Sequence, residues 1–334
     1  MLVQRRSMHC VIRSFFIFVT SIFACVANAA TVTDLYEVTM PIEQSRDTAF
    51  VEALKAVAVK VSGRRDAGAR LGPAASSPRQ YVQRFAFTLD NQLQVAFDSG
   101  SVDRLLSDAG LPIWGRERPA TLVLVSVPGP DGSPNWLDVN FAAGEREAIA
   151  KSARLRGLPI VWPSLTPQDR SMLASASAGS SAELLELATR SNANAVLFGH
   201  ARRDGAGALS VQWNLFSQEG AANAGGSLDE GIHLAADTLG RVYATAGGTV
   251  GAVAIEIAGI RNLDDYASTL NYLEGMTLVR SVALEQVTGD TMRLQLAVRG
   301  DASTLRRALA LDSRLVAAGG GETPGDRLQF RLNR

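Results

Sequence analysis

Segment 111–119 carries the residue types that most often anchor protein interfaces. Trp114 is followed by Arg116 and Arg118 on a stretch that proline restricts, so an aromatic ring and guanidinium groups can be displayed together. Asp98, at the end of an expected strand, is a candidate ion-pair partner for one of these arginines. We therefore predict an interaction patch made of Trp114, Arg116, Arg118 and Asp98. The alternative is that Trp114 fills a gap between two folding units while the arginines pair with acids.

Other residues capable of chemistry are scattered along the chain. His200 and His233 are the histidines that follow the first 29 residues, and neither has a neighbour at metal-ligand spacing. The sequence contains no HExxH, no GxSxG and no Walker phosphate-binding sequence. Asp264 and Asp265 stand at an expected helix start, where acids offset the helix dipole. We predict no catalytic residue, no metal and no cofactor, and a protein that is not an enzyme.

Residues 1–29 have the pattern of a signal peptide for export. A basic start precedes the apolar run 14–26, and Ala27-Asn28-Ala29 supplies small residues for cleavage. The run is about 13 residues long, which is short of the roughly 20 that span a bilayer. We expect cleavage and a periplasmic protein with no stable transmembrane anchor. Lipidation at Cys25 is the minor alternative, because Ile22-Phe23-Ala24 distantly resembles the sequence before a lipidated cysteine.

Composition argues against several classes of protein. Both cysteines, Cys10 and Cys25, lie in the leader, so the expected mature chain has no disulfide and no thiolate nucleophile. Loss of the leader leaves 30 basic against 33 acidic side chains, without a basic stripe, so we expect no nucleic-acid partner. The chain is 46% hydrophobic, and about 305 mature residues can build more than one core.

The first block of elements, residues 30–118, reads as a strand-helix-hairpin α+β module. Apolar residues alternate from 36 to 40, and a helix follows with Asp47 as its cap and Gly63 just after its end. Alternation on both sides of Asp90-Asn91 predicts a β-hairpin. The stretch 63–78, rich in small residues, is expected to be a mobile loop.

The second block, residues 119–248, alternates strands and helices and predicts a layered α/β module. Its apolar run 121–127 suits a strand buried on both faces, and the alternation over 209–215 predicts a strand antiparallel to the one before it. The third block, residues 249–334, has the element order βαββαβ of a ferredoxin-like module, with a flexible Gly-rich loop at 319–325. The predicted fold is therefore α/β and α+β in three small modules.

Several phrases in these blocks resemble the proteobacterial envelope proteins grouped as domain of unknown function 2066. The phrases are residues 49–54, 59–63, 95–98, 111–119, 157–163, 195–200 and 213–215. The resemblance implies an envelope location and no established activity, and Thr166 stands near a position where members often carry an acid. The middle block is also similar to the amino-terminal domain of the translocation protein TolB and its curli and flagellar relatives, which implies a role in assembly.

These observations together predict an exported cell-envelope protein that binds other envelope proteins as a non-catalytic scaffold or adaptor. The alternative is a periplasmic small-ligand binder or a hydrolase that uses carboxylates. Nothing in the sequence indicates an oligomeric state.

Overall fold

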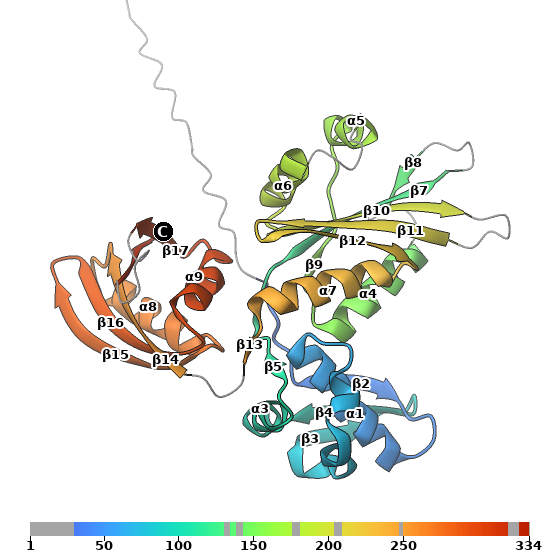
Figure 1. The fold of residues 1–334 in the computed structure, drawn as a ribbon, viewed down its shortest axis with the longest axis horizontal. Coiled ribbons are helices and arrows are strands. Elements are labelled where there is room, and N and C mark those ends of the chain that lie inside the picture. The colour runs from blue at the N-terminus through green and yellow to red at the C-terminus, as the bar shows by residue number, and fades with distance from the viewer. Residues whose placement is uncertain are drawn as a thin grey trace, which may run out of the picture.

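A computed structural model describes residues 30–129, 134–137, 143–175, 181–203, 209–246, 250–319 and 327–333. The expected leader, the turn 205–207 and most of the expected loop 319–325 lie outside them. Within the described residues the structure is mixed α/β, with three larger sheets and two short strand pairs (Figure 1). None of the described helices is long and apolar enough to cross a membrane.

The N-terminal sheet has the strand order β2-β4-β3 and is antiparallel throughout. Helix α1 packs Phe50, Leu54, Val57 and Val61 into the core of this sheet. Helix α3, which was not predicted although Val102, Leu105 and Leu106 follow helical spacing, adds a second helix to that core. The bounds of these elements are β2 (Glu37–Pro41), α1 (Arg46–Ser62), β3 (Val82–Phe87), β4 (Gln92–Phe97) and α3 (Ser99–Asp108).

Two local expectations for this region are wrong. The cap of α1 is Ser45 rather than Asp47, because the Ser45 hydroxyl accepts the Thr48 N–H at 3.1 Å. The stretch expected to be a loop folds into short helices, because Leu71 and Ala75 are buried in the core. These helices are α2 (Ala67–Arg70), η1 (Gly72–Ser76) and η2 (Pro78–Tyr81).

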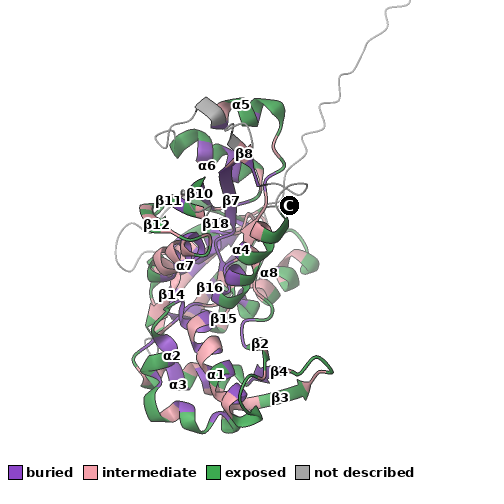
Figure 2. Ribbon diagram, turned by 90° about the vertical axis from the view of Figure 1, so that its right-hand side faces the viewer, coloured by how far each residue is buried: buried purple, intermediate pink, exposed green. Residues whose placement is uncertain are grey.

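The middle sheet has the order β12-β11-β10-β7-β8, with β9 beside β7. Helices α4 and α7 cover one face and α5 and α6 the other. The prediction that 121–127 is buried on both faces is confirmed, as Figure 2 shows for β7. The strands are β7 (Thr121–Pro128), β8 (Pro134–Trp136), β9 (Ile160–Val161), β10 (Ala195–Arg203), β11 (Leu209–Ser217) and β12 (Gly220–Gly226), and the helices α4 (Ala143–Arg156), α5 (Pro167–Ser175), α6 (Ser181–Arg190) and α7 (Glu230–Tyr243).

Small residues let the middle sheet accept a large ring. Trp213 on β11 is fully buried, and a Cβ on Gly199 or Gly231 would approach its ring to 2.5 or 2.3 Å. The indole N–H donates to the carbonyl of Ser227 at 3.0 Å. Strand β11 runs antiparallel to β10, as predicted, and α7 begins over the Trp213 ring.

The C-terminal sheet has the order β15-β16-β14-β18-β17 and a core shared with α8 and α9. The expected βαββαβ order is one strand short, because an additional strand, β17, forms before the last strand. Leu315 of β17 is buried and pairs with Leu332 of β18. Because β17 reverses the chain once more, β18 lies parallel to β14. The elements are β14 (Val250–Ala258), α8 (Leu263–Gly275), β15 (Val279–Thr288), β16 (Thr291–Arg299), α9 (Ala302–Ala310), β17 (Leu315–Gly319) and β18 (Leu328–Leu332).

Candidate functional site

Segment 111–119 forms hydrogen bonds with parts of the chain that belong to each of the three larger sheets and their helices: Val61 of α1, Gly157 after α4, and Thr277 before β15. Its two short strands each pair with a distant part of the chain, β5 (Pro112–Ile113) with β13 (Thr245–Ala246) and β6 (Glu117–Arg118) with β1 (Ala30–Thr31). Between them, the backbone N–H of Trp114 donates to the carbonyl of Val61 at 2.8 Å. The segment therefore contacts α1, the residues that follow α7, and strand β1. We call it the junction segment.

Arg118 is the most enclosed charged side chain of this segment. It is fully buried, and its five guanidinium N–H groups all donate to backbone carbonyls. The acceptors are the oxygens of Lys60, Trp114, Gly115, Arg156 and Gly157, at 2.7 to 3.1 Å. Burial lowers the pKa of Arg118 to about 9, so the group is still cationic at neutral pH. Within the described part of the chain no carboxylate pairs with it.

Helix ends account for this choice of partners. Lys60 lies in the last turn of α1, and Arg156 and Gly157 lie at the end of α4, so Arg118 meets the carbonyl ends of two helices. Such ends carry partial negative charge, which a cation offsets. The guanidinium also stacks on the Trp114 ring, with Cζ 4.1 Å from the ring centroid. One side chain thus joins α1, α4 and the junction segment.

Trp114 completes the contact with a third helix. A Cβ on Gly63 would approach the ring to 2.8 Å and one on Gly240 to 3.3 Å, so both positions favour glycine. Gly63 also has φ of 71°, in the left-handed region, where it ends α1. Trp114 therefore lies between the ends of α1 and α7, as in the alternative stated for it above.

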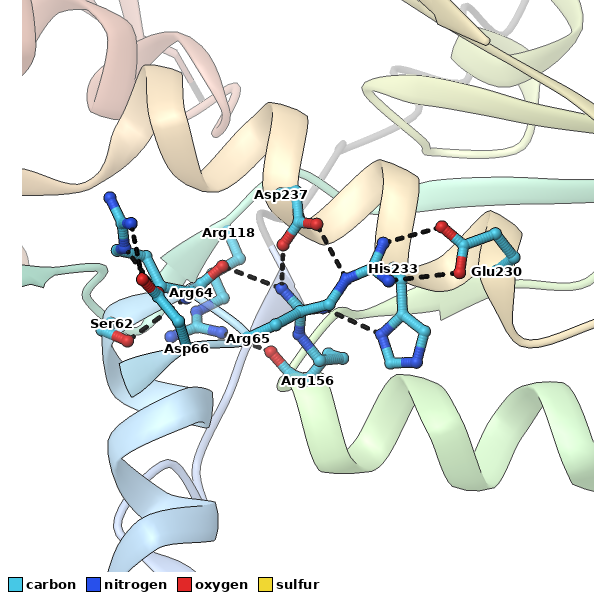
Figure 3. Close-up of polar contacts among 10 residues, drawn as sticks. Ser62, Arg64, Arg65, Asp66, Arg118, Arg156, Glu230, His233 and Asp237 are labelled. Atoms are coloured by element: carbon cyan, nitrogen blue, oxygen red, sulfur yellow. Dashed lines mark hydrogen bonds and ion pairs between the residues drawn. The ribbon is translucent and has the colours of Figure 1, made fainter. Parts of the chain in front are cut away.

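A second buried arginine extends the junction toward α7. Arg156 donates to the carbonyl of Gly63 at 2.8 Å, to a carboxylate oxygen of Asp237 and to Nδ1 of His233 at 2.8 Å (Figure 3). Arg65, which follows α1, donates to both carboxylate oxygens of Glu230 and to Asp237 at 2.9 Å. Two arginines from different elements are therefore bound to one face of α7.

His233 is neutral in this arrangement. Arginine has only donors, so Nδ1 of His233 must accept the bond from Arg156 and leave the ring proton on Nε2. Burial lowers the pKa of His233 from 6.5, and the positive charges of Arg156 and Arg65 lower it further, while Asp229 and Glu230 act in the opposite direction. Acid should therefore weaken the contact between α4 and α7.

The C-terminal sheet is attached to the same region by polar contacts. Arg299, at the end of β16, is buried and donates to Asp103 of α3 at 2.8 Å, and Asp103 also accepts the hydroxyl of Tyr36 at 2.7 Å. The carboxylate of Glu117 in the junction segment accepts the backbone N–H of Thr277 at 3.0 Å. These bonds tie the C-terminal sheet both to the N-terminal sheet and to the junction segment.

A cleft of about 380 Å³ opens beside the junction. Its walls are the turn after α1, strand β5 and the last two turns of α7. The lining residues are Ser62, Gly63, Arg64, Arg65, Asp66, Pro112, Asp237, Gly240, Arg241 and Ala244. Among the described residues, no group of three or more His, Cys, Asp or Glu is placed to hold a metal ion.

The predicted surface patch does not exist as a patch. Trp114 and Arg118 are fully buried, because the helix ends and glycines described above enclose them. Arg116 is exposed, and its backbone N–H donates to Thr277 at 3.1 Å. Asp98 is the cap of α3 and accepts the backbone N–H of Ser101 at 2.8 Å, so the expected pairing with Arg116 or Arg118 is wrong.

Sequence reasoning missed the partners that make the junction. Arg156 and Asp237 look in the sequence like ordinary charged residues of helix surfaces, and Arg65 lies in a stretch expected to be a loop. The spacing around His233 gives no sign of its contact with Arg156, because α4 and α7 are far apart in the chain. His200 is exposed on β10.

Comparison with known proteins adds one finding. A family model described as "Domain of unknown function (DUF8605)" matches residues 29–115, which include the N-terminal sheet and the start of the junction segment. The expectation of a domain of unknown function is confirmed in that coarse sense, under a different family description from the one the sequence resembles. No curated protein and no solved structure matches the chain.

Replacing Arg118 by lysine should destabilise the protein. Lysine keeps the charge but has three donors in place of five, so at least two buried carbonyls lose their hydrogen bonds, each at about 1 to 3 kcal/mol. We expect the free energy of unfolding in urea to fall by about 3 kcal/mol or more. Arg116→Lys, on the same segment but exposed, is the matched control and should stay within about 0.5 kcal/mol of the wild type. Equal stability of the two variants would refute this reading of Arg118.

Stability should fall with acid through His233. Because the folded pKa lies below the unfolded value of 6.5, the unfolded chain binds more protons, and stability is lost as the pH drops below about 6.5. Glutamine keeps a hydrogen-bonding side chain but does not titrate. The thermal unfolding midpoint of His233→Gln should therefore change less between about pH 7 and pH 5, the range in which histidine titrates, than that of the wild type. His200→Gln, at an exposed histidine, should leave the wild-type pH dependence unchanged. The same slope in all three proteins would contradict the assignment.

Proposed function

We propose that this chain is an exported cell-envelope protein that acts in the periplasm as a non-catalytic scaffold or adaptor for other envelope proteins. The observation that carries the proposal is the junction itself. The buried side chains of Arg118, Arg156 and Arg299 form hydrogen bonds between elements of the three sheets, and sheets joined in this way suit a protein that positions partners. The middle and C-terminal sheets each have an edge strand that remains available to a partner.

Open strand edges supply surfaces for partners. Strand β12 lies at the edge of the middle sheet and pairs, within the described residues, with β11 alone; it carries no charged residue and no register shift. Strand β15 is likewise an edge strand, with Leu284 and Val287 each 47% exposed. Exposed edges of this kind accept an added strand from another chain.

The finer sequence resemblances support the same role. The leader pattern of residues 1–29 supports export, and the phrases similar to domain of unknown function 2066 support an envelope location. The likeness of the middle block to the TolB amino-terminal domain supports an assembly role. We also propose that the chain divides into three modules, at residues 30–118, 119–248 and 249–334.

A periplasmic small-ligand binder is the second candidate. The cleft of about 380 Å³ beside the junction favours it, because pockets of a few hundred Å³ are typical of small-molecule sites. A hydrolase that uses carboxylates gains less support, since the two aspartates of the cleft, Asp66 and Asp237, are both bound to arginines.

Photo-crosslinking in living cells tests the scaffold proposal. A photoreactive residue at Asn223 on β12 or Leu284 on β15 should capture a discrete envelope protein, recovered with the periplasmic fraction. Leu89, fully exposed in the turn between β3 and β4, is the control position and should capture much less. The proposal fails if no position captures a protein while the purified chain retains or turns over a metabolite, or if the intact chain with its leader is found in the cytosol.

A further inference from the structure

We propose that the cleft beside the junction binds a small molecule through an oxyanion group, a carboxylate or a phosphate. The inference goes beyond the scaffold role and stands independently of it. It rests on the balance of charge in the cleft, on Arg241, for which the described residues provide no ion-pair partner, and on the composition of the walls.

Positive charge exceeds negative charge along the cleft. Three guanidinium groups line it, those of Arg64, Arg65 and Arg241, against the carboxylates of Asp66 and Asp237. Both carboxylates already form ion pairs with arginines. Asp66 accepts two bonds from Arg64, each of 2.9 Å, and Asp237 accepts bonds from Arg65 and from the buried Arg156, which does not line the cleft. No carboxylate of the lining is therefore left for Arg241.

Arg241 and Arg64 are the side chains able to bind a ligand. Arg241 is exposed in the last turn of α7, and among the described residues none forms an ion pair with it. Arg64 and Asp66 are an exposed pair, with side chains 47% and 51% exposed, and such pairs contribute little to stability, so a ligand can displace Asp66 at small cost. Arg65, held by Glu230 and Asp237, stays in place as a fixed positive charge.

The guanidinium groups of the cleft indicate which class of ligand it binds. Its planar fork matches the two oxygens of a carboxylate or phosphate and binds them in a bidentate manner. Pro112, Gly240 and Ala244 provide an uncharged wall beside the arginines, which suits the carbon skeleton of a small organic acid or phosphate ester. Because the walls come from the turn after α1 and from α7, a bound ligand would bridge the N-terminal and middle sheets.

Titration of the purified protein followed by amide NMR tests the site. The probes are inorganic phosphate and succinate, with ionic strength held constant by sodium chloride. At least one probe should shift the amide signals of Gly63, Gly240 and Ala244 in a saturable way. The probe that binds more tightly identifies the phosphate or the carboxylate as the preferred group.

Variants decide whether the arginines carry the binding. Arg241→Gln and Arg64→Gln should each weaken binding by roughly fivefold or more (about 1 kcal/mol). Arg280→Gln, at an exposed arginine on β15, is the matched control and should leave affinity unchanged. Both cleft arginines are exposed, so the thermal midpoints without ligand should match the wild type. Shifts that rise linearly without saturation, or equal affinity in Arg241→Gln, would overturn the proposal and leave the scaffold role untouched.

Discussion

A buried guanidinium with five backbone acceptors is the constraint on which the arrangement of this molecule depends. Removing an isolated cation from water costs several kcal/mol, so Arg118 is tolerated only if the protein replaces its hydration. It does so with carbonyls from α1, α4 and the junction segment, two of which are helices that end at that point. The helices must therefore meet there, or both the cation and the carbonyls lose their partners.

The same residues explain why a surface prediction became an internal contact. Tryptophan and arginine anchor interfaces between proteins because they combine large area with directed hydrogen bonds. Interfaces between parts of one chain resemble those between proteins. Trp114 and Arg118 thus perform the predicted kind of chemistry, and their partners are α1, α4 and α7 of the same chain. The sequence shows which residue types are present, but it does not show whether their side chains are buried inside the protein or exposed at its surface.

Patterns set by neighbouring residues were predictable, and those set by distant contacts were not. The alternation around Asp90-Asn91 and the apolar run of β7 led to a hairpin and a buried strand, both of which the structure contains. Strand β17 was missed because Leu315, Val316 and Ala317 are apolar in succession and show no alternation, and its formation depends on pairing with β18. The carbonyls around Arg118 belong to residues of any type, so no spacing in the sequence could identify them.

On this account, Arg118 and Trp114 hold the N-terminal and middle sheets in one fixed arrangement. Pulsed electron spin resonance between labels at Leu89, beside the N-terminal sheet, and Asn223 on β12 of the middle sheet, both exposed, measures it most directly. With Cys10 and Cys25 replaced by serine, two introduced cysteines are the only thiols in the chain. The account predicts one narrow distance distribution that broadens when Arg118 is replaced by lysine. A broad distribution in the otherwise unaltered chain, or one that the Arg118 substitution leaves unchanged, would contradict it.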